Sequence, residues 1–226
     1  MRLVRKIIYI GECNESAVYF DTEKNIALSA PKSHLLNTTA AGRINRWLPI
    51  LVGVMVIGGG SIGFFTTANP FGGYYNYGTL VFLMFAWLFE FIGLVWIVER
   101  ALYKHVKQAQ PTDKRYFRAA IYSNLLWNNF EDKRVTIGKK IWAWVMTGIF
   151  IAVNCSIIPI VNKIVLSDVR NQVPIGSDII LTSMLGIMPF CLVLLIWQNN
   201  PIRFFNIVGK YQKRELTWGK VMKERK

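Results

Sequence analysis

Residues 79–98 decide the broad class of this chain, and their sequence is TLVFLMFAWLFEFIGLVWIV. These twenty residues contain no Lys or Arg and a single acid, Glu90. A helix of that length crosses the hydrocarbon core of a bilayer, which is about 30 Å thick. Similar runs without any charged residue occupy residues 47–67, 141–161 and 179–197. Because backbone polar groups in lipid must bond within the segment, we predict four transmembrane helices.

The composition agrees with this class and excludes several others. Apolar residues make up 53% of the 226-residue chain and charged residues 18%, against roughly 25% charged in ordinary soluble domains. A soluble enzyme, a secreted disulfide scaffold and a disordered chain are excluded. We expect an all-α integral membrane protein with a four-helix membrane domain over residues 47–198. An N-terminal segment (1–46), a loop (99–140) and a basic tail (199–226) lie outside the bilayer.

The distribution of basic residues predicts the orientation of the spans. Of 27 Lys and Arg residues, 25 lie before the first span, between spans two and three, or after span four. Only Lys163 and Arg170 fall on the opposite side. The positive-inside rule therefore places both termini and the loop in the cytoplasm of a multi-pass cell-membrane protein. The net charge of +14 is then explained by anionic lipid headgroups as a partner, and nucleic acid is not expected.

The N-terminal segment contains short β-rich stretches separated by turn residues. Residues 6–10, 17–20 and 26–28 are rich in β-branched, aromatic and aliphatic residues. This pattern predicts a β-hairpin or small meander. Because a two-stranded hairpin alone is marginally stable, we expect it to dock on the central loop or on the membrane face.

The central loop contains an amphipathic helix candidate over residues 113–130. Phe117, Ile121 and Leu125 recur at helical spacing, with basic residues outside that stripe. The simplest interpretation places this helix in the membrane interface, and the alternative is a partner-binding helix. Residues 201–214 repeat the mixture of apolar and basic residues and are interpreted as a juxtamembrane anchor.

Glu90 is the most informative polar residue because an ionisable group within a span costs at least a few kcal/mol. It is either a proton, cation or partner site, or a protonated group hydrogen-bonded inside the bundle. Asn154 and Thr182 are the candidate partners for the second case. Together Glu90, Asn154 and Thr182 form the candidate intramembrane polar site.

Other residues point to helix packing rather than chemistry. Gly59 and Gly63 form a Gly-x-x-x-Gly pattern that permits close helix approach. Pro159 and Pro189 are expected to kink the third and fourth spans. Three scattered cysteines and two histidines give no metal-ligand spacing, so we expect no metal and no cofactor. No catalytic constellation is recognisable, and the chain is predicted not to be an enzyme.

The N-terminal stretch carries one resemblance. Residues Lys6-Ile-Ile-Tyr-Ile10 through Ala17-Val-Tyr-Phe-Asp21 are similar to the Tyr-rich hairpin that precedes the first span in the Gram-positive tandem five-transmembrane family. The overall length and the basic middle loop also resemble that family, although this chain has four predicted spans. The resemblance implies a bacterial protein of self-protection against membrane-damaging toxins, and it assigns no residue roles.

Two functions therefore remain open from the sequence. The first is a non-enzymatic immunity protein that binds a toxin or another membrane protein within the bilayer. The second is a small transporter or an accessory subunit of an ABC-type exporter complex, supported by Glu90, Asn154 and the predicted kinks. Small size and short outer loops favour the first.

Overall fold

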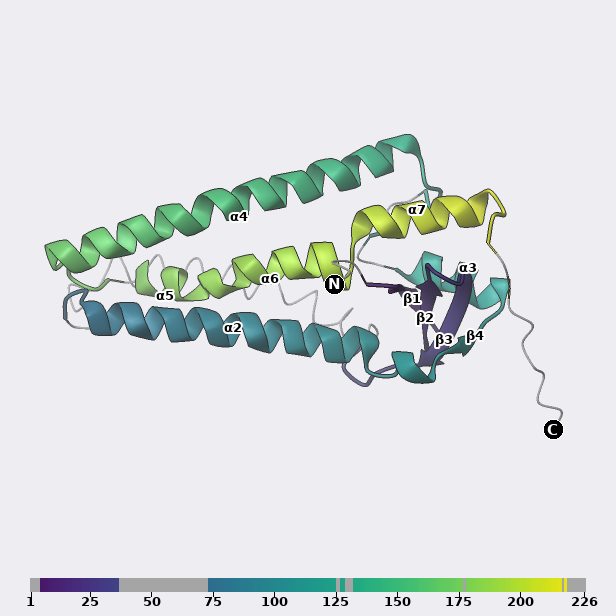
Figure 1. Cartoon of the computed structure of the whole chain (residues 1–226), viewed down its shortest axis with the longest axis horizontal. Coiled ribbons are helices and arrows are strands. Elements are labelled where there is room, and N and C mark those ends of the chain that lie inside the picture. The colour runs from purple at the N-terminus through teal and green to yellow at the C-terminus, as the bar shows by residue number, and fades with distance from the viewer. Residues whose placement is uncertain are drawn as a thin grey trace. The chain divides into compact units, whose positions relative to one another are not determined.

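The computed structural model describes residues 5–36, 73–124, 127–128, 132–176, 178–216 and 218. The chain divides into two compact units. Figure 1 labels the helices and strands that belong to them. The first, here called the sheet unit, comprises Met1–Leu36, Val95–Ile151 and Cys191–Lys226. The second, here called the helical unit, comprises Asn37–Leu94 and Ala152–Phe190. The boundaries at 94/95, 151/152 and 190/191 fall inside helices, so these helices contribute to each unit.

Within the described residues, three helical stretches are long and apolar enough to cross a membrane: Tyr77–Gln108, Ile137–Asn171 and Met184–Gln212. They include the predicted spans 79–98 and 141–161 and most of 179–197. Helix α2 (Tyr77–Tyr103) exposes large apolar side chains such as Phe85 and Phe89, as a lipid-facing surface requires. The predicted span 47–67, with Gly59 and Gly63, lies outside the described residues.

Helix α4 (Ile137–Asn171) is longer than the predicted third span, which was expected to end near residue 161. Val165 and Val169 continue its buried face by one helical turn each, so the helix persists through Lys163 and Arg170. It ends where Gln172 adopts the left-handed conformation (φ 50°) and the Val173 N–H donates to the Asp168 carbonyl (3.0 Å). This geometry is a Schellman C-cap.

The fourth predicted span is broken into several short helices. Helix α5 (Asp178–Ser183), the 3₁₀ turn η2 (Met184–Gly186), helix α6 (Ile187–Val193) and the π-turn η3 (Leu194–Gln198) follow one another. Pro189 cannot donate to the Leu185 carbonyl and its ring crowds that group. The 3₁₀ turn therefore occurs where the proline interrupts regular α-helical bonding.

The sheet unit contains a four-stranded antiparallel sheet in the order β1-β2-β3-β4. Its strands are β1 (Ile7–Cys13), β2 (Ser16–Asp21), β3 (Ile26–Pro31) and β4 (Gln110–Pro111). The first three form the predicted meander, with Asn14 and Asn25 at positive φ in its turns. We expected an all-α protein with a hairpin. The structure instead combines helices with a four-stranded sheet, because β4 from the central loop pairs with the last strand of the meander.

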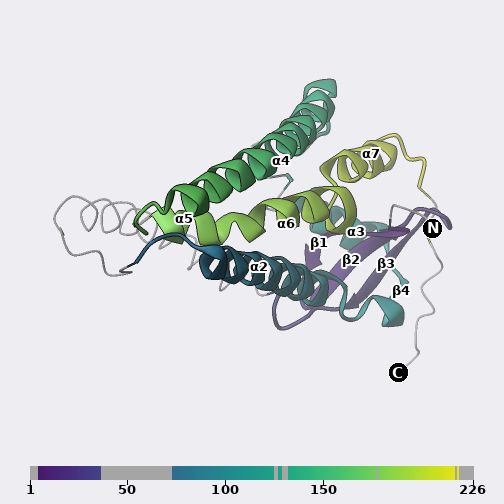
Figure 2. The same cartoon turned by 60° about the vertical axis from the view of Figure 1, so that its left-hand side comes forward.

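Two helices pack beside this sheet (Figure 2). Helix α3 (Lys114–Ser123) contacts β1, and its apolar residues Phe117, Ala120 and Ile121 are buried in the protein core. Docking of the N-terminal strands on the central loop is confirmed. The interpretation of residues 113–130 as an interfacial helix is wrong, because the apolar stripe is covered by the sheet. The helix also ends at Ser123, where the Asn124 side chain donates to the Ile10 carbonyl (2.6 Å).

Helix α7 (Pro201–Gln212) completes the same core rather than forming a juxtamembrane anchor. Asn200 caps it by accepting a hydrogen bond from the Arg203 N–H (3.0 Å), and Pro201 occupies the first helical position. Phe204 and Phe205 are fully buried. A short 3₁₀ helix, η1 (Val106–Gln108), links α2 to β4.

Candidate functional site

One face of α2 in the helical unit meets the broken fourth span. Leu83, Trp87 and Glu90 are spaced four and three residues apart, so they lie on the same side of the helix. Leu83 is fully buried. The Trp87 indole N–H donates to the backbone carbonyl of Thr182 (2.6 Å), which fixes the ring against the end of α5.

Gly186 brings the backbones of α2 and the 3₁₀ turn into close contact. A Cβ atom at this position would lie 2.5 Å from the Trp87 carbonyl oxygen and 2.7 Å from Glu90 Oε2. Real Cβ atoms do not approach other atoms so closely, so only glycine fits here without a shift of the backbone. The glycine therefore sets the distance between the two helices.

Glu90 is half-buried, and its Oε2 atom lies against Gly186. Among the described residues no donor reaches this buried oxygen with hydrogen-bond geometry, although the Gly186 backbone N–H interacts with the same carboxylate. An acceptor shielded from water and left without a donor costs free energy of about 1–3 kcal/mol. The site thus presents a carboxyl oxygen that a donor or a cation from outside the described residues would stabilise.

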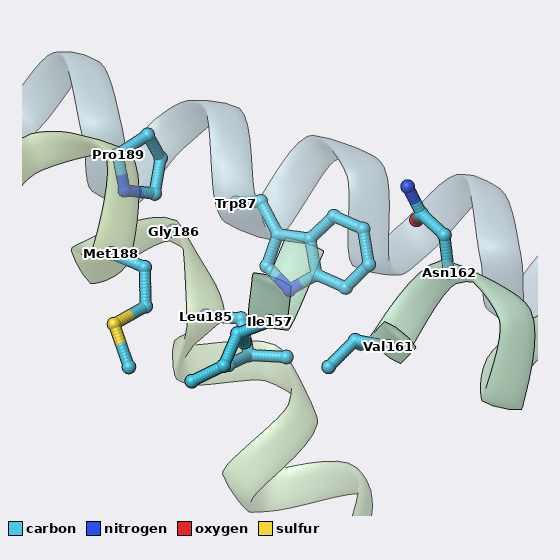
Figure 3. A pocket seen from close by; sticks show the side chains of 8 residues that line it. All are labelled: Trp87, Ile157, Val161, Asn162, Leu185, Gly186, Met188 and Pro189. Carbon is cyan, nitrogen blue, oxygen red and sulfur yellow. The ribbon is translucent and has the colours of Figure 1, made fainter. Parts of the chain in front are cut away.

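A small cavity adjoins this contact (Figure 3). Its volume is about 140 Å³, and Trp87 lies in the middle of the side chains that surround it. Helix α4 contributes Ile157, Val161 and Asn162, and the broken span contributes Leu185, Gly186, Met188 and Pro189. The lining is apolar except for the Asn162 amide at one edge, so the cavity suits an aliphatic or aromatic group of modest size.

The predicted site residues are placed as follows. Thr182 belongs to the site through its backbone carbonyl, and the turn that follows it contacts Glu90. Asn154 is fully buried on α4 in the same unit. Gly59 and Gly63 fall outside the described residues.

Sequence reasoning missed Trp87 and Gly186 as members of the site. Trp87 precedes Glu90 by one helical turn, and that spacing was available as a signal. Gly186 precedes Pro189 by three residues, and such a pair predicts a break in a span but not which helix the break contacts.

No cluster of three His, Cys, Asp or Glu residues able to hold a metal occurs in the part of the chain that the structure describes. Comparison of the chain with protein-family models, with curated proteins and with solved structures finds no match.

Proposed function

We propose that this chain is a non-enzymatic, multi-pass protein of the cell membrane that protects its cell by binding a membrane-active toxin within the bilayer. Four spans and cytoplasmic termini are part of this proposal. The observation that carries it is the apolar cavity around Trp87 beside the buried Glu90 oxygen, which no donor among the described residues reaches with hydrogen-bond geometry.

The chemistry of this site suits a membrane-inserted peptide. The Trp87 ring is held by its bond to Thr182, so a binding partner meets a preformed aromatic wall. An apolar side chain of the toxin would occupy the cavity, and a donor or ammonium group of the same peptide would reach Glu90. In a medium of low dielectric constant such a polar contact discriminates strongly between partners. The resemblance of residues 6–21 to the tandem five-transmembrane family supports the same function.

A protection assay tests the proposal. Cells that express the chain are challenged with a panel of pore-forming peptides, and survival is compared with that of cells lacking it. Val161→Trp fills the cavity and is expected to abolish protection. Ile160→Trp is the matched control, because its side chain is exposed on the adjacent position of α4 and does not line the cavity. Equal protection by both variants, at equal membrane abundance, would exclude this cavity as the toxin site.

The alternative function is that of a transporter or an accessory subunit of an ABC-type exporter. The Glu90 oxygen that lacks a donor among the described residues and the broken fourth span favour it. Affinity purification in mild detergent separates the two functions, because a stoichiometric ATPase or large permease supports the alternative and a co-purifying toxin supports the first. A transport activity lost in a folded Glu90→Gln variant would decide for the alternative.

A further inference from the structure

A second apolar cavity lies in the sheet unit, separate from the Trp87 site. Its volume is about 280 Å³. Helix α4 lines it with Trp142, Met146 and Phe150, and the α6–η3 segment lines it with Cys191, Leu194 and Leu195. No polar surface of the described residues faces it.

The residues on α4 that line this cavity extend along the helix axis. Trp142, Met146 and Phe150 are four residues apart, so they form one stripe along the helix. Eight residues of helix cover about 12 Å. A groove of this length along a transmembrane helix fits an extended hydrocarbon chain better than a compact group.

One end of the cavity lies near the start of α4, where basic residues are concentrated. Trp127 and Pro201 also line the cavity, and the Trp127 indole N–H donates to Asn199 Oδ1 (2.9 Å). Tryptophan is typical of the headgroup layer. Residues 131–140 contain four basic and two acidic residues.

Lys139 places a positive charge in line with the cavity. It precedes Trp142 by three residues and so lies on the same stripe of α4. The carbonyls of Asp132 and Arg134 accept from its ammonium group, the second at 2.7 Å, which holds that group close to the segment that precedes α4. A fixed cation beside an apolar groove is complementary to a phosphate attached to an acyl chain.

We infer that this cavity binds one acyl chain of an anionic phospholipid from the cytoplasmic leaflet, with the headgroup next to Lys139. The site rests on the membrane location of α4 and α6 and is independent of toxin binding at Trp87. The bound acyl chain is part of the sheet unit and lies between α4 and the π-turn.

Native mass spectrometry of the full chain in mild detergent tests this inference. The protein is titrated with phosphatidylglycerol and with phosphatidylcholine of identical chains. We expect one phosphatidylglycerol to bind with a Kd about tenfold lower than that of phosphatidylcholine, a difference of about 1.4 kcal/mol. Met146→Trp fills the groove and is expected to remove this binding, whereas Val145→Trp, at an exposed neighbouring position, retains it. Lys139→Gln abolishes the preference for phosphatidylglycerol and Lys139→Arg restores it.

The unmodified protein provides a second measurement that does not depend on variants folding. Cys191 lines the groove, while Cys155 is exposed on α4 outside it. Saturating phosphatidylglycerol is expected to slow alkylation of Cys191 by an apolar maleimide and to leave Cys155 unchanged. Equal alkylation of Cys191 with and without lipid, or equal lipid binding by Met146→Trp and Val145→Trp, would overturn the inference. Equal affinity for the two lipids would overturn the role of Lys139.

Discussion

At the scale of single residues, Gly186 is the position where the intramembrane site tolerates least change. We predict that Gly186→Ala lowers the free energy of unfolding by about 1–3 kcal/mol, because the new methyl group must push the Trp87 backbone away. The displacement also weakens the bond from Trp87 to the Thr182 carbonyl. Thermal unfolding in detergent measures the effect.

Gly93→Ala is the control for this prediction. Gly93 lies on the same helix as Trp87, and a Cβ atom there would meet nothing within 4 Å. The control is expected to unfold at the temperature of the unmodified protein or above it, because alanine favours helix over glycine. Equal midpoints for the two variants would contradict the close contact at Gly186.

At the scale of elements, two tyrosines and one arginine connect the N-terminal segment, the end of α2 and η3. The Tyr19 hydroxyl donates to the Leu102 carbonyl (2.7 Å), and the Tyr103 hydroxyl donates to the Gln198 carbonyl. Arg5 lies over the Tyr103 ring (3.6 Å) and donates to the Glu99 carboxylate (2.8 Å). These contacts are long-range in sequence, and they join the first thirty residues to α2 and α2 to η3.

Burial raises the pKa of Tyr19, and it raises the pKa of Tyr9 as well, with the Glu12 charge adding to the shift at Tyr9. A phenol whose pKa is higher in the folded state stabilises the fold fully below its unfolded pKa of about 10. That contribution is lost as the pH rises above 10, because the unfolded chain releases the proton first. We therefore predict that the sheet unit loses stability above pH 10, by up to about 1.4 kcal/mol per pH unit for each such tyrosine.

Tyr19→Phe isolates the contribution of one hydroxyl. It removes the bond to Leu102, which costs about 0.5–1.5 kcal/mol at neutral pH, and it makes the decline above pH 10 shallower. Denaturant unfolding followed by circular dichroism at pH 8, 10 and 11 measures both effects. Tyr116→Phe is the control because Tyr116 is exposed, at 39% of its surface. An unchanged pH slope in Tyr19→Phe would refute the assignment.

At the scale of the whole molecule, local sequence patterns predicted the helices and strands better than they predicted which of these elements pack together. The apolar runs predicted α2 and most of α4, and the turn residues near Asn14 and Asn25 predicted the meander. The pairing of Ser29 with Gln110 joins segments some eighty residues apart, and a two-residue strand carries no periodic signal. The apolar side of α3 was visible in the sequence, but hydrophobic spacing alone does not distinguish burial under a sheet from burial in lipid.

The same limit applies to the intramembrane site. Glu90 was conspicuous because a charge within a span is costly. Its neighbour Gly186 was not, since a glycine gains its meaning only from the backbone that approaches it. The break in the helix near Pro189 was predictable from the chemistry of proline, whereas its contact with α2 depends on tertiary packing.

The positions of the helix ends lead to a last prediction, on the topology in the membrane. In the helical unit the Tyr75 N–H donates to the Val173 carbonyl (2.8 Å), and the Ile175 N–H donates to the Gly73 carbonyl (2.9 Å). The start of α2 and the end of α4 therefore lie together, as two spans of opposite direction require. Since 25 of 27 basic residues lie before the first predicted span, between spans two and three, or after span four, we predict that the start of α2 and the end of α4 face outward.

In a chain whose native cysteines are replaced by serine, Tyr77→Cys is expected to react with an impermeant maleimide on intact cells, because that position is 76% exposed. Lys114→Cys, on the solvent side of α3, is expected to react only after permeabilisation. The reverse pattern of labelling would invert the topology and place the sheet unit outside the cell.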